Sequence, residues 1–101
     1  MNLNKVHEFE QMIVTLLNMQ GWNLEWCGGG FEHFDCIGTS PKGKEVVVEI
    51  KWRKKYYEKK MIEKYKFDKL IEEDAEALYF VADPKGHYIF WLNDLAKQET
   101  V

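Results

Sequence analysis

Two acidic residues and a lysine, Asp35, Glu49 and Lys51, have the side-chain types that metal-assisted hydrolysis of a phosphodiester requires. Carboxylates supply the hard oxygen ligands that Mg²⁺ accepts together with water and substrate phosphate. A lysine beside them can orient a water molecule and offset the charge that develops on the phosphorus during attack. These residue types suggest phosphodiester chemistry, provided that the fold brings the three side chains together.

A hairpin determines whether Asp35 and Glu49 meet. Pro41-Lys42-Gly43 has the residues of a three-residue hairpin loop, with glycine at the left-handed position. This loop pairs Ser40 with Lys44, and counting back along both strands places Asp35 opposite Glu49. Directly opposed residues of an antiparallel pair lie on the same face, with Cβ atoms about 5 Å apart. The two-residue repeat of a strand predicts that the lysine two positions after Glu49 shares this face.

The repulsion between the two opposed carboxylates must be offset by positive charge. The residue pattern leaves two sources of that charge open. Two like charges placed opposite each other are destabilising, and a divalent cation between them would turn that cost into binding energy. Alternatively, Glu49 and Lys51 neutralise each other along one strand as a plain ion pair. The valines at 46–48 and Ile50 favour a buried central strand, where an unpaired carboxylate is costly.

A helix over residues 4–20 precedes these strands. Apolar residues recur along it at helical spacing, Asn4 is a candidate N-cap, and Gly21 is a candidate C-terminal stop. Glu10 lies on the flank of the apolar stripe, on the same side as Leu17. We expect Glu10 to face along the sheet, although a surface position on the helix is the alternative.

The remaining pattern predicts an α/β (α+β) fold with the element order α-β-β-β-α-β-β-α. A second Pro-Lys-Gly, at 84–86, predicts a second hairpin, and Asn93 is a candidate cap of a last short helix. A mixed sheet of about five strands with helices on both sides is the expected packing. The expected strands cover 22–27, 31–40, 44–52, 77–83 and 87–92, an irregular piece covers 53–60, and later helices cover 61–74 and 93–97.

Length and composition place narrow limits on the class of protein. The 101 residues suit one domain over residues 1–101, and no apolar run approaches the ~20 residues of a membrane helix. Two cysteines are too few for a disulfide scaffold, so we expect a reducing, cytoplasmic environment and no membrane partner.

The net charge of −3 conceals a basic stretch. Residues 51–69 contain nine basic and three acidic side chains, a local charge of +6. A local patch of this kind decides where phosphates bind, although a solvated, charged helix is the plainer interpretation. The basic side chains expected to contact nucleic acid are Arg53, Lys54, Lys55, Lys59, Lys60 and Lys66.

Asp35, followed on the next strand by Glu49-Ile50-Lys51 and preceded by a helix bearing Glu10, resembles the PD-(D/E)XK nuclease superfamily. The likeness is greatest to its small Holliday-junction-resolvase-like and phage members and extends over residues 9–92, with Phe34 where the family pattern has proline. The resemblance implies a restriction-endonuclease-like core. It implies that Asp35, Glu49 and the Ile50 carbonyl bind the metal, and that Lys51 and Glu10 complete the catalytic set.

The resemblance also implies a function. It suggests an Mg²⁺-dependent endonuclease, with Mn²⁺ as a substitute, that cleaves DNA in a structure-directed or weakly sequence-specific way, in a prokaryotic or phage-infected cytoplasm. RNA stays open as a substrate, and a homodimer is expected. The alternatives are a catalytically silent relative that binds nucleic acid or acts as an inhibitor, and a protein-interaction module that uses exposed aromatic side chains.

Overall fold

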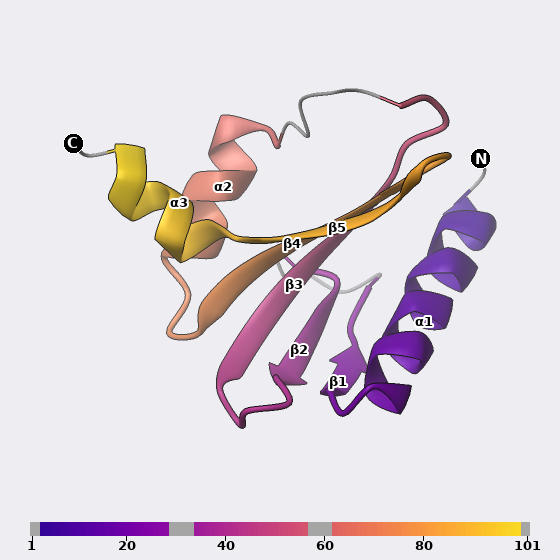
Figure 1. Ribbon diagram of the computed structural model, residues 1–101, viewed down its shortest axis with the longest axis horizontal. Helices are drawn as coiled ribbons and strands as arrows, with labels where there is room; N and C mark the ends of the chain where they lie inside the picture. Colours follow the sequence, from indigo (N-terminus) through magenta and orange to yellow (C-terminus); the bar gives the residue numbers. More distant parts are fainter. Residues whose placement is uncertain (1–2, 29–33, 57–61, 100–101) are drawn as a thin grey trace.

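The computed structural model describes residues 3–28, 34–56 and 62–99 and forms one mixed sheet with helices on both faces (Figure 1). The element order matches the predicted one. None of the helices in these ranges is long and apolar enough to cross a membrane. The elements are α1 (Leu3–Met19), β1 (Asn23–Trp26), β2 (Cys36–Thr39), β3 (Glu45–Trp52), α2 (Lys64–Ile71), β4 (Glu76–Asp83), β5 (Gly86–Trp91) and α3 (Leu92–Glu99).

The five strands lie in the order β1-β2-β3-β4-β5, which places β3 in the middle of the sheet. β3 and β4 are parallel, and the other neighbouring strands are antiparallel. A parallel pair needs a crossover connection, and the segment that contains α2 supplies it. The central position of β3 explains why its valines are buried, with relative exposures of 0–2% for Val46, Val47 and Val48.

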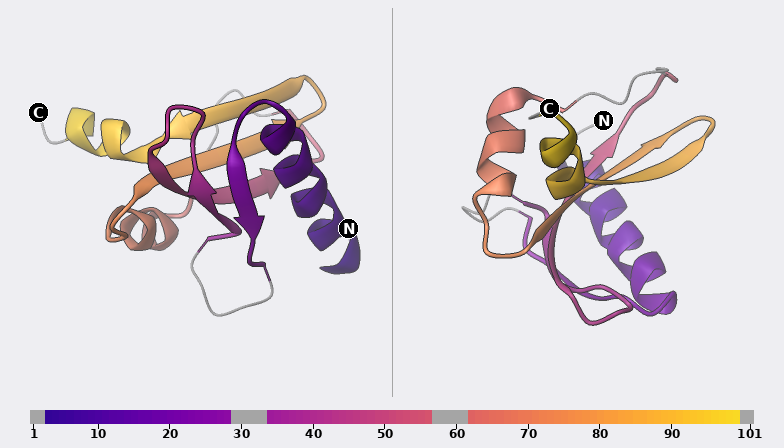
Figure 2. Two further views of the ribbon diagram at one scale, coloured as in Figure 1. Left: turned by 90° about the horizontal axis from the view of Figure 1, so that it is seen from below. Right: turned by 60° about the vertical axis from the view of Figure 1, so that its left-hand side comes forward.

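The sheet separates two apolar cores (Figures 1 and 2). On one face, Ile13, Val14 and Leu17 of α1 pack with alternate residues of the strands. On the other face, Leu70 of α2 and Leu92 at the start of α3 pack against the intervening strand residues. The alternation of a strand sends successive side chains to opposite faces, so each strand contributes to both cores.

The two Pro-Lys-Gly sequences form two different turns. Gly43 has φ of 83° and closes the β2–β3 loop, in which the Gly43 N–H donates to the Ser40 carbonyl. In the β4–β5 turn, Gly86 already belongs to β5 and pairs with Asp83. There the Asp83 carboxylate accepts from the Lys85 N–H, 2.8 Å away, in an Asx turn. Both hairpins were predicted, and the second has the shorter loop.

Several predicted boundaries were wrong. Asn4 does not cap α1, because the helix already includes Leu3. Asn93 lies inside α3, and its side-chain oxygen accepts from the Ala77 N–H at 2.8 Å instead of capping the helix. The helical spacing of apolar residues predicts that Leu16 belongs to the buried stripe of α1, but Leu16 is 45% exposed. Of the strand predicted for 31–40, only β2 is a regular strand. Of the helix predicted for 61–74, only α2 is helical. Residues 29–33 and 57–61 lie outside the described ranges.

Candidate active site

The predicted register between β2 and β3 is confirmed over the residues that pair, with Ile37 opposite Val47 and Cys36 opposite Val48. The prediction that Asp35 pairs directly with Glu49 was wrong. The Asp35 N–H donates to the Val48 carbonyl at 2.8 Å, so the chain at Asp35 is one residue out of the hairpin register. Asp35 therefore stands at the position where β2 begins and the central strand runs on beyond it.

Asp35 is fixed by the main chain of β3. Its Oδ2 accepts a hydrogen bond of 2.7 Å from the Ile50 N–H. In an antiparallel pair, the N–H and C=O of one residue point to the same neighbouring strand. The Ile50 carbonyl therefore points to the side of β2, as the Val48 carbonyl does, but beyond the last paired residue of that strand. This direction brings the Ile50 carbonyl oxygen to the same side as the Asp35 carboxylate.

Glu10 reaches this region from α1. It is only 6% exposed, and its Oε1 accepts a 3.0 Å hydrogen bond from the indole N–H of Trp26. The ring of His7 contacts Trp26 edge to face, with ring centroids 5.2 Å apart, and His7 is half-buried. The prediction that Glu10 faces the sheet is confirmed.

A cavity of about 420 Å³ joins these groups. It brings together all four predicted catalytic side chains, Glu10, Asp35, Glu49 and Lys51, with the main chain of Ile50. Its remaining lining is part apolar and part basic. These further residues are Val6, Phe9, Trp52, Lys54 and Lys66.

Burial and like charge raise the pKa values of both central carboxyls. Burial raises the pKa of Asp35 to about 6, with Glu10 adding repulsion and the Ile50 N–H opposing the rise. Burial also raises the pKa of Glu49 to about 7, and the neighbouring Asp35 is the next largest cause. Paired carboxyls that disfavour simultaneous ionisation are typical of functional sites.

Positive charge approaches from α2. Lys66 Nζ lies 3.7 Å from Glu49 Oε1, and the Lys66 ammonium lowers the pKa of both Asp35 and Glu49. Lys51 lines the same cavity and also lowers the pKa of Glu49. The alternative in which Glu49 pairs only with Lys51 is not what the structure shows, because the ion pair runs to Lys66.

Two residues of this region, Trp26 and Tyr79, are not among the predicted site residues. Trp26 is a large apolar residue suited to a core, but its indole N–H donates to Glu10. Tyr79 lies beside Glu49 in the parallel register of β3 and β4 and lines a smaller cavity of about 50 Å³ with Glu49, Lys51 and Lys66. The strand alternation of residues 77–83 is a signal that could have found Tyr79, once the parallel register was known.

The predicted nucleic-acid-binding residues fall into three groups. Lys54 and Lys66 line the larger cavity, and Lys55 is exposed next to Lys54 in sequence. Burial raises the pKa of the Tyr79 hydroxyl. A hydrogen bond with the Arg53 side chain lowers this pKa by a smaller amount. Lys59 and Lys60 lie outside the described residues.

The donor set suits a small divalent cation. Two carboxylates that repel each other and a main-chain carbonyl on the same side are hard oxygen donors of the kind Mg²⁺ and Mn²⁺ accept. Within residues 3–28, 34–56 and 62–99, no three His, Cys, Asp or Glu side chains are close enough to hold a metal by themselves. A cation here would thus depend on Asp35, Glu49, the Ile50 carbonyl, water and substrate oxygens.

Comparison with known proteins gives one informative result. No family model and no curated protein matches the chain by sequence. Among solved structures, the chain is similar to Hjc of Archaeoglobus fulgidus, a Holliday junction resolvase from an archaeal hyperthermophile. The TM-score is 0.68 at 19% identity, over 85% of this chain and 71% of the resolvase. The predicted fold class is confirmed: the chain shares the fold of this resolvase.

Proposed function

We propose that the protein is a divalent-cation-dependent endonuclease that hydrolyses phosphodiester bonds in DNA. One observation carries the proposal: on a resolvase fold, a single cavity brings Glu10, Asp35, Glu49 and Lys51 together beside the Ile50 main chain. The clustered acidic residues and the neighbouring ammonium groups are what phosphodiester hydrolysis needs.

Each residue has a role that its surroundings support. Asp35, Glu49 and the Ile50 carbonyl would hold Mg²⁺ or Mn²⁺, which when bound supplies Lewis-acid polarisation of the phosphate. Lys51, which lines the cavity, would orient the attacking water and offset charge on the phosphate oxygens. Glu10 accepts from Trp26 with one oxygen, which orients the carboxylate toward the cavity.

The hydrolysis forms one P–O bond and breaks another. The water oxygen forms a new bond to phosphorus while one ester P–O bond breaks and leaves with its electron pair. The proton lost by water is accepted within the cavity or by solvent, and the leaving oxygen gains a proton to become a hydroxyl. The products are one phosphate monoester end and one hydroxyl end.

Basic side chains at the rim of the cavity would position the substrate. Lys54, Lys55 and Lys66 stand beside the candidate active site and would contact phosphates without reading bases. Binding of this kind favours recognition of nucleic-acid shape over a long sequence. We therefore propose a branched or flexible DNA as the substrate.

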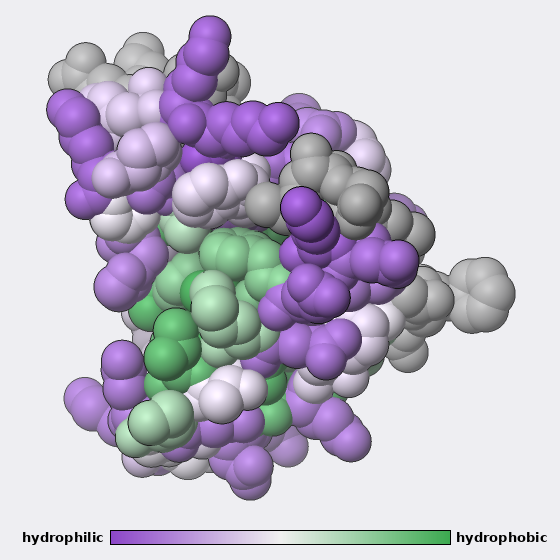
Figure 3. Space-filling model, turned by 90° about the vertical axis from the view of Figure 1, so that its right-hand side faces the viewer, coloured by the Kyte–Doolittle hydropathy of each residue, from purple (hydrophilic) through white to green (hydrophobic). Residues whose placement is uncertain are grey.

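A homodimer is the proposed working form. Two antiparallel strands of DNA are related by two-fold symmetry, and a two-fold dimer would present one active site to each strand. Apolar side chains gather on one side of the molecule (Figure 3). Met12 and Leu16 of α1 are 50% and 45% exposed, and Ile89 of β5, on the same face of the sheet as Phe80, is 39% exposed. Covering such a surface is the usual role of a second subunit.

Light scattering after gel filtration tests the dimer. Leu16→Glu combined with Ile89→Glu should convert it to a monomer, while Ile37→Glu, an exposed apolar residue of another strand, should leave the dimer intact. A wild-type monomer at all concentrations tested would refute the proposed dimer.

A cleavage assay tests the nuclease. Supercoiled plasmid, single-stranded DNA, a four-way junction and a structured RNA are incubated with Mg²⁺, Mn²⁺ or chelator. Glu49→Gln is the test variant, and Glu45→Gln, an exposed residue at the other end of the same strand, is the matched control. The proposal predicts metal-dependent cutting by wild type and Glu45→Gln alone. Cutting that persists in Glu49→Gln, or no cutting of any substrate, would contradict it.

A further inference from the structure

A second cavity lies at the other end of the sheet. It has a volume of about 330 Å³ and is lined from the β2–β3 hairpin, the first residue of β4, the last residue of β5 and the first turn of α3. Its lining consists of Ser40, Pro41, Lys42, Lys44, Glu76, Trp91 and Asp94. Because β3 runs from Glu45 toward Lys51, this cavity and the candidate active site lie at opposite ends of that strand. At ~3.3 Å per residue, they are separated by roughly 15–20 Å.

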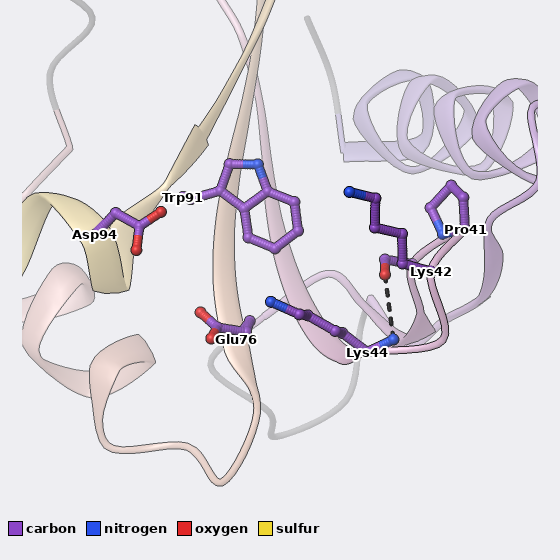
Figure 4. Close-up of a pocket in the computed structure, with 7 residues that line it drawn as sticks. Pro41, Lys42, Lys44, Glu76, Trp91 and Asp94 are labelled. Carbon is purple, nitrogen blue, oxygen red and sulfur yellow. Dashed lines mark hydrogen bonds between the residues drawn. The ribbon is translucent and has the colours of Figure 1, made fainter.

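The centre of this pocket is an aromatic ring (Figure 4). The indole of Trp91 lies between Lys42 on one side and the carboxylates of Glu76 and Asp94 on the other. Trp22 contacts Trp91, with ring centroids 6.5 Å apart and planes tilted by 30°, and so supports the indole. A supported, half-buried indole is a platform on which a flat ring can stack.

Among the described residues, the lysines and carboxylates around Trp91 form no ion pairs with one another. In the described part of the chain, no ion pair within 4.0 Å joins Lys42 or Lys44 to Glu76 or Asp94. The Lys44 ammonium points toward Glu76 without reaching that distance (Figure 4). The buried Ser40 hydroxyl accepts from the Lys44 N–H at 3.2 Å, which fixes the main chain of the hairpin at Lys44. The pocket therefore offers separate cationic and anionic groups to a ligand.

The indole, the lysines and the carboxylates of this pocket together suit one chemical class of ligand. An anion alone would be repelled by Glu76 and Asp94, and a cation alone by Lys42 and Lys44. A nucleotide has a flat base to stack on Trp91, a phosphate for the lysines and, in guanine, adjacent N–H donors that a carboxylate accepts. The cavity is within the size range of small-ligand sites. A duplex does not fit, because its bases are stacked and paired.

We propose that this pocket binds one unstacked nucleotide, with the base on Trp91, the phosphate on Lys42 and Lys44, and the base N–H groups on Glu76 or Asp94. The pocket would hold a displaced strand or a free nucleotide away from the candidate active site. The proposal does not depend on cleavage, since none of these residues lines the active-site cavity.

The four tryptophans provide a direct test by NMR. Their indole N–H signals are followed during titration with dGMP, dTMP or inorganic phosphate in chelator. Trp22 and Trp91 report on this pocket, whereas Trp26 and Trp52 report on the candidate active site. Saturable shifts of the Trp91 signal, larger for dGMP than for dTMP or phosphate, are the expected result.

Substitutions in the pocket test which side chains contact the nucleotide. Lys42→Ala with Lys44→Ala should weaken dGMP binding about tenfold or more, since two charge-assisted contacts to phosphate are lost. Glu76→Gln should reduce the preference for dGMP over dTMP. Lys69→Ala, an exposed lysine on α2, should change nothing. Lys42, Lys44 and Lys69 are exposed and Glu76 is half-buried, so we expect these variants to fold.

Three outcomes would overturn the proposal. The first is a shift confined to Trp26 and Trp52, which would place the nucleotide in the candidate active site. The second is dGMP binding unchanged by the double lysine substitution. The third is absence of nucleotide binding. A zwitterionic dipeptide, used as a further probe, that shifts the Trp91 signal when no nucleotide does would belong to this third outcome. None of these results bears on cleavage, so failure here is distinguishable from failure of the nuclease proposal.

Discussion

The two ends of β3 carry the same kinds of side chain in different surroundings. At the end with Glu49 and Lys51, the acidic groups are enclosed: Glu10 is 6% exposed and the Glu49 side chain 13%. At the other end, Lys42, Lys44 and Asp94 are exposed around Trp91. An enclosed carboxylate must find a proton or a cation, whereas an exposed charge is already solvated. Burial thus separates a site suited to metal-assisted chemistry from one suited to ligand contact.

Loss of a central carboxylate should have the largest effect. Asp35→Asn keeps an acceptor for the Ile50 N–H but removes the charge, so we expect cleavage to fall on the order of 10³-fold. Single-turnover rates on the best DNA substrate measure this. If Asp35→Asn retains wild-type activity, the enclosed end of β3 is not where the chemistry occurs.

Loss of the lysine should come next. Lys51→Met keeps most of the side-chain length and should reduce the rate about 10²-fold, because the developing charge loses a nearby ammonium. Lys69→Met on α2 is the matched control and should cleave like wild type. The single-turnover rate, with substrate affinity measured in parallel, distinguishes this effect from weaker DNA binding. Equal rates in the two variants would remove Lys51 from the catalytic set.

The enclosed carboxylates should also make stability depend on pH. The pKa of Asp35 rises from 3.8 to about 6, and that of Glu49 from 4.5 to about 7. The folded protein then binds more protons than the unfolded chain in this range, so the free energy of unfolding falls as pH rises. We expect a loss on the order of 2 kcal/mol between about pH 5 and about pH 8 in chelator.

Denaturant unfolding across this pH range checks the prediction. Glu49→Gln should flatten the dependence, while Glu45→Gln should leave it as in wild type. Added Mg²⁺ should restore stability mainly at the upper end of the range. Stability that rises with pH would show that the two carboxyls are compensated in another way.

The hydrogen bond to Glu10 should have the smallest of these effects. Trp26→Phe keeps the ring but removes the indole N–H, and losing an orienting partner of this kind typically costs about tenfold in activity. In a double-mutant cycle, Trp26→Phe combined with Glu10→Gln should be little worse than Glu10→Gln alone. Additive effects would show that Trp26 acts independently of Glu10.

Local rules were sufficient to predict that Asp35 and Glu49 lie near each other at one end of the β2–β3 hairpin, although not their exact pairing. A loop of known length determines the register of the hairpin that it closes, and the register then determines which side chains meet. Helical phase likewise predicted that Glu10 is directed toward the sheet. These predictions succeeded because each depends on residues close in sequence.

The predictions that failed depend on contacts between distant segments. Asn93 has the side chain of an N-cap, but the Ala77 N–H competes for its oxygen across the sheet. The contacts of Tyr79 require the parallel register of β3 and β4, which no short turn specifies. Trp26 is apolar enough for the core, and only the packing of α1 against β1 brings its N–H to Glu10.

Manganese binding tests the central claim most directly. Electron paramagnetic resonance of free Mn²⁺ during titration counts the ions bound by wild type, Glu49→Gln and Glu45→Gln at a pH above both raised pKa values. We predict saturable binding by wild type and Glu45→Gln, strongly weakened in Glu49→Gln. Equal binding by all three proteins, or none by wild type, would contradict a metal centre at the enclosed end of β3.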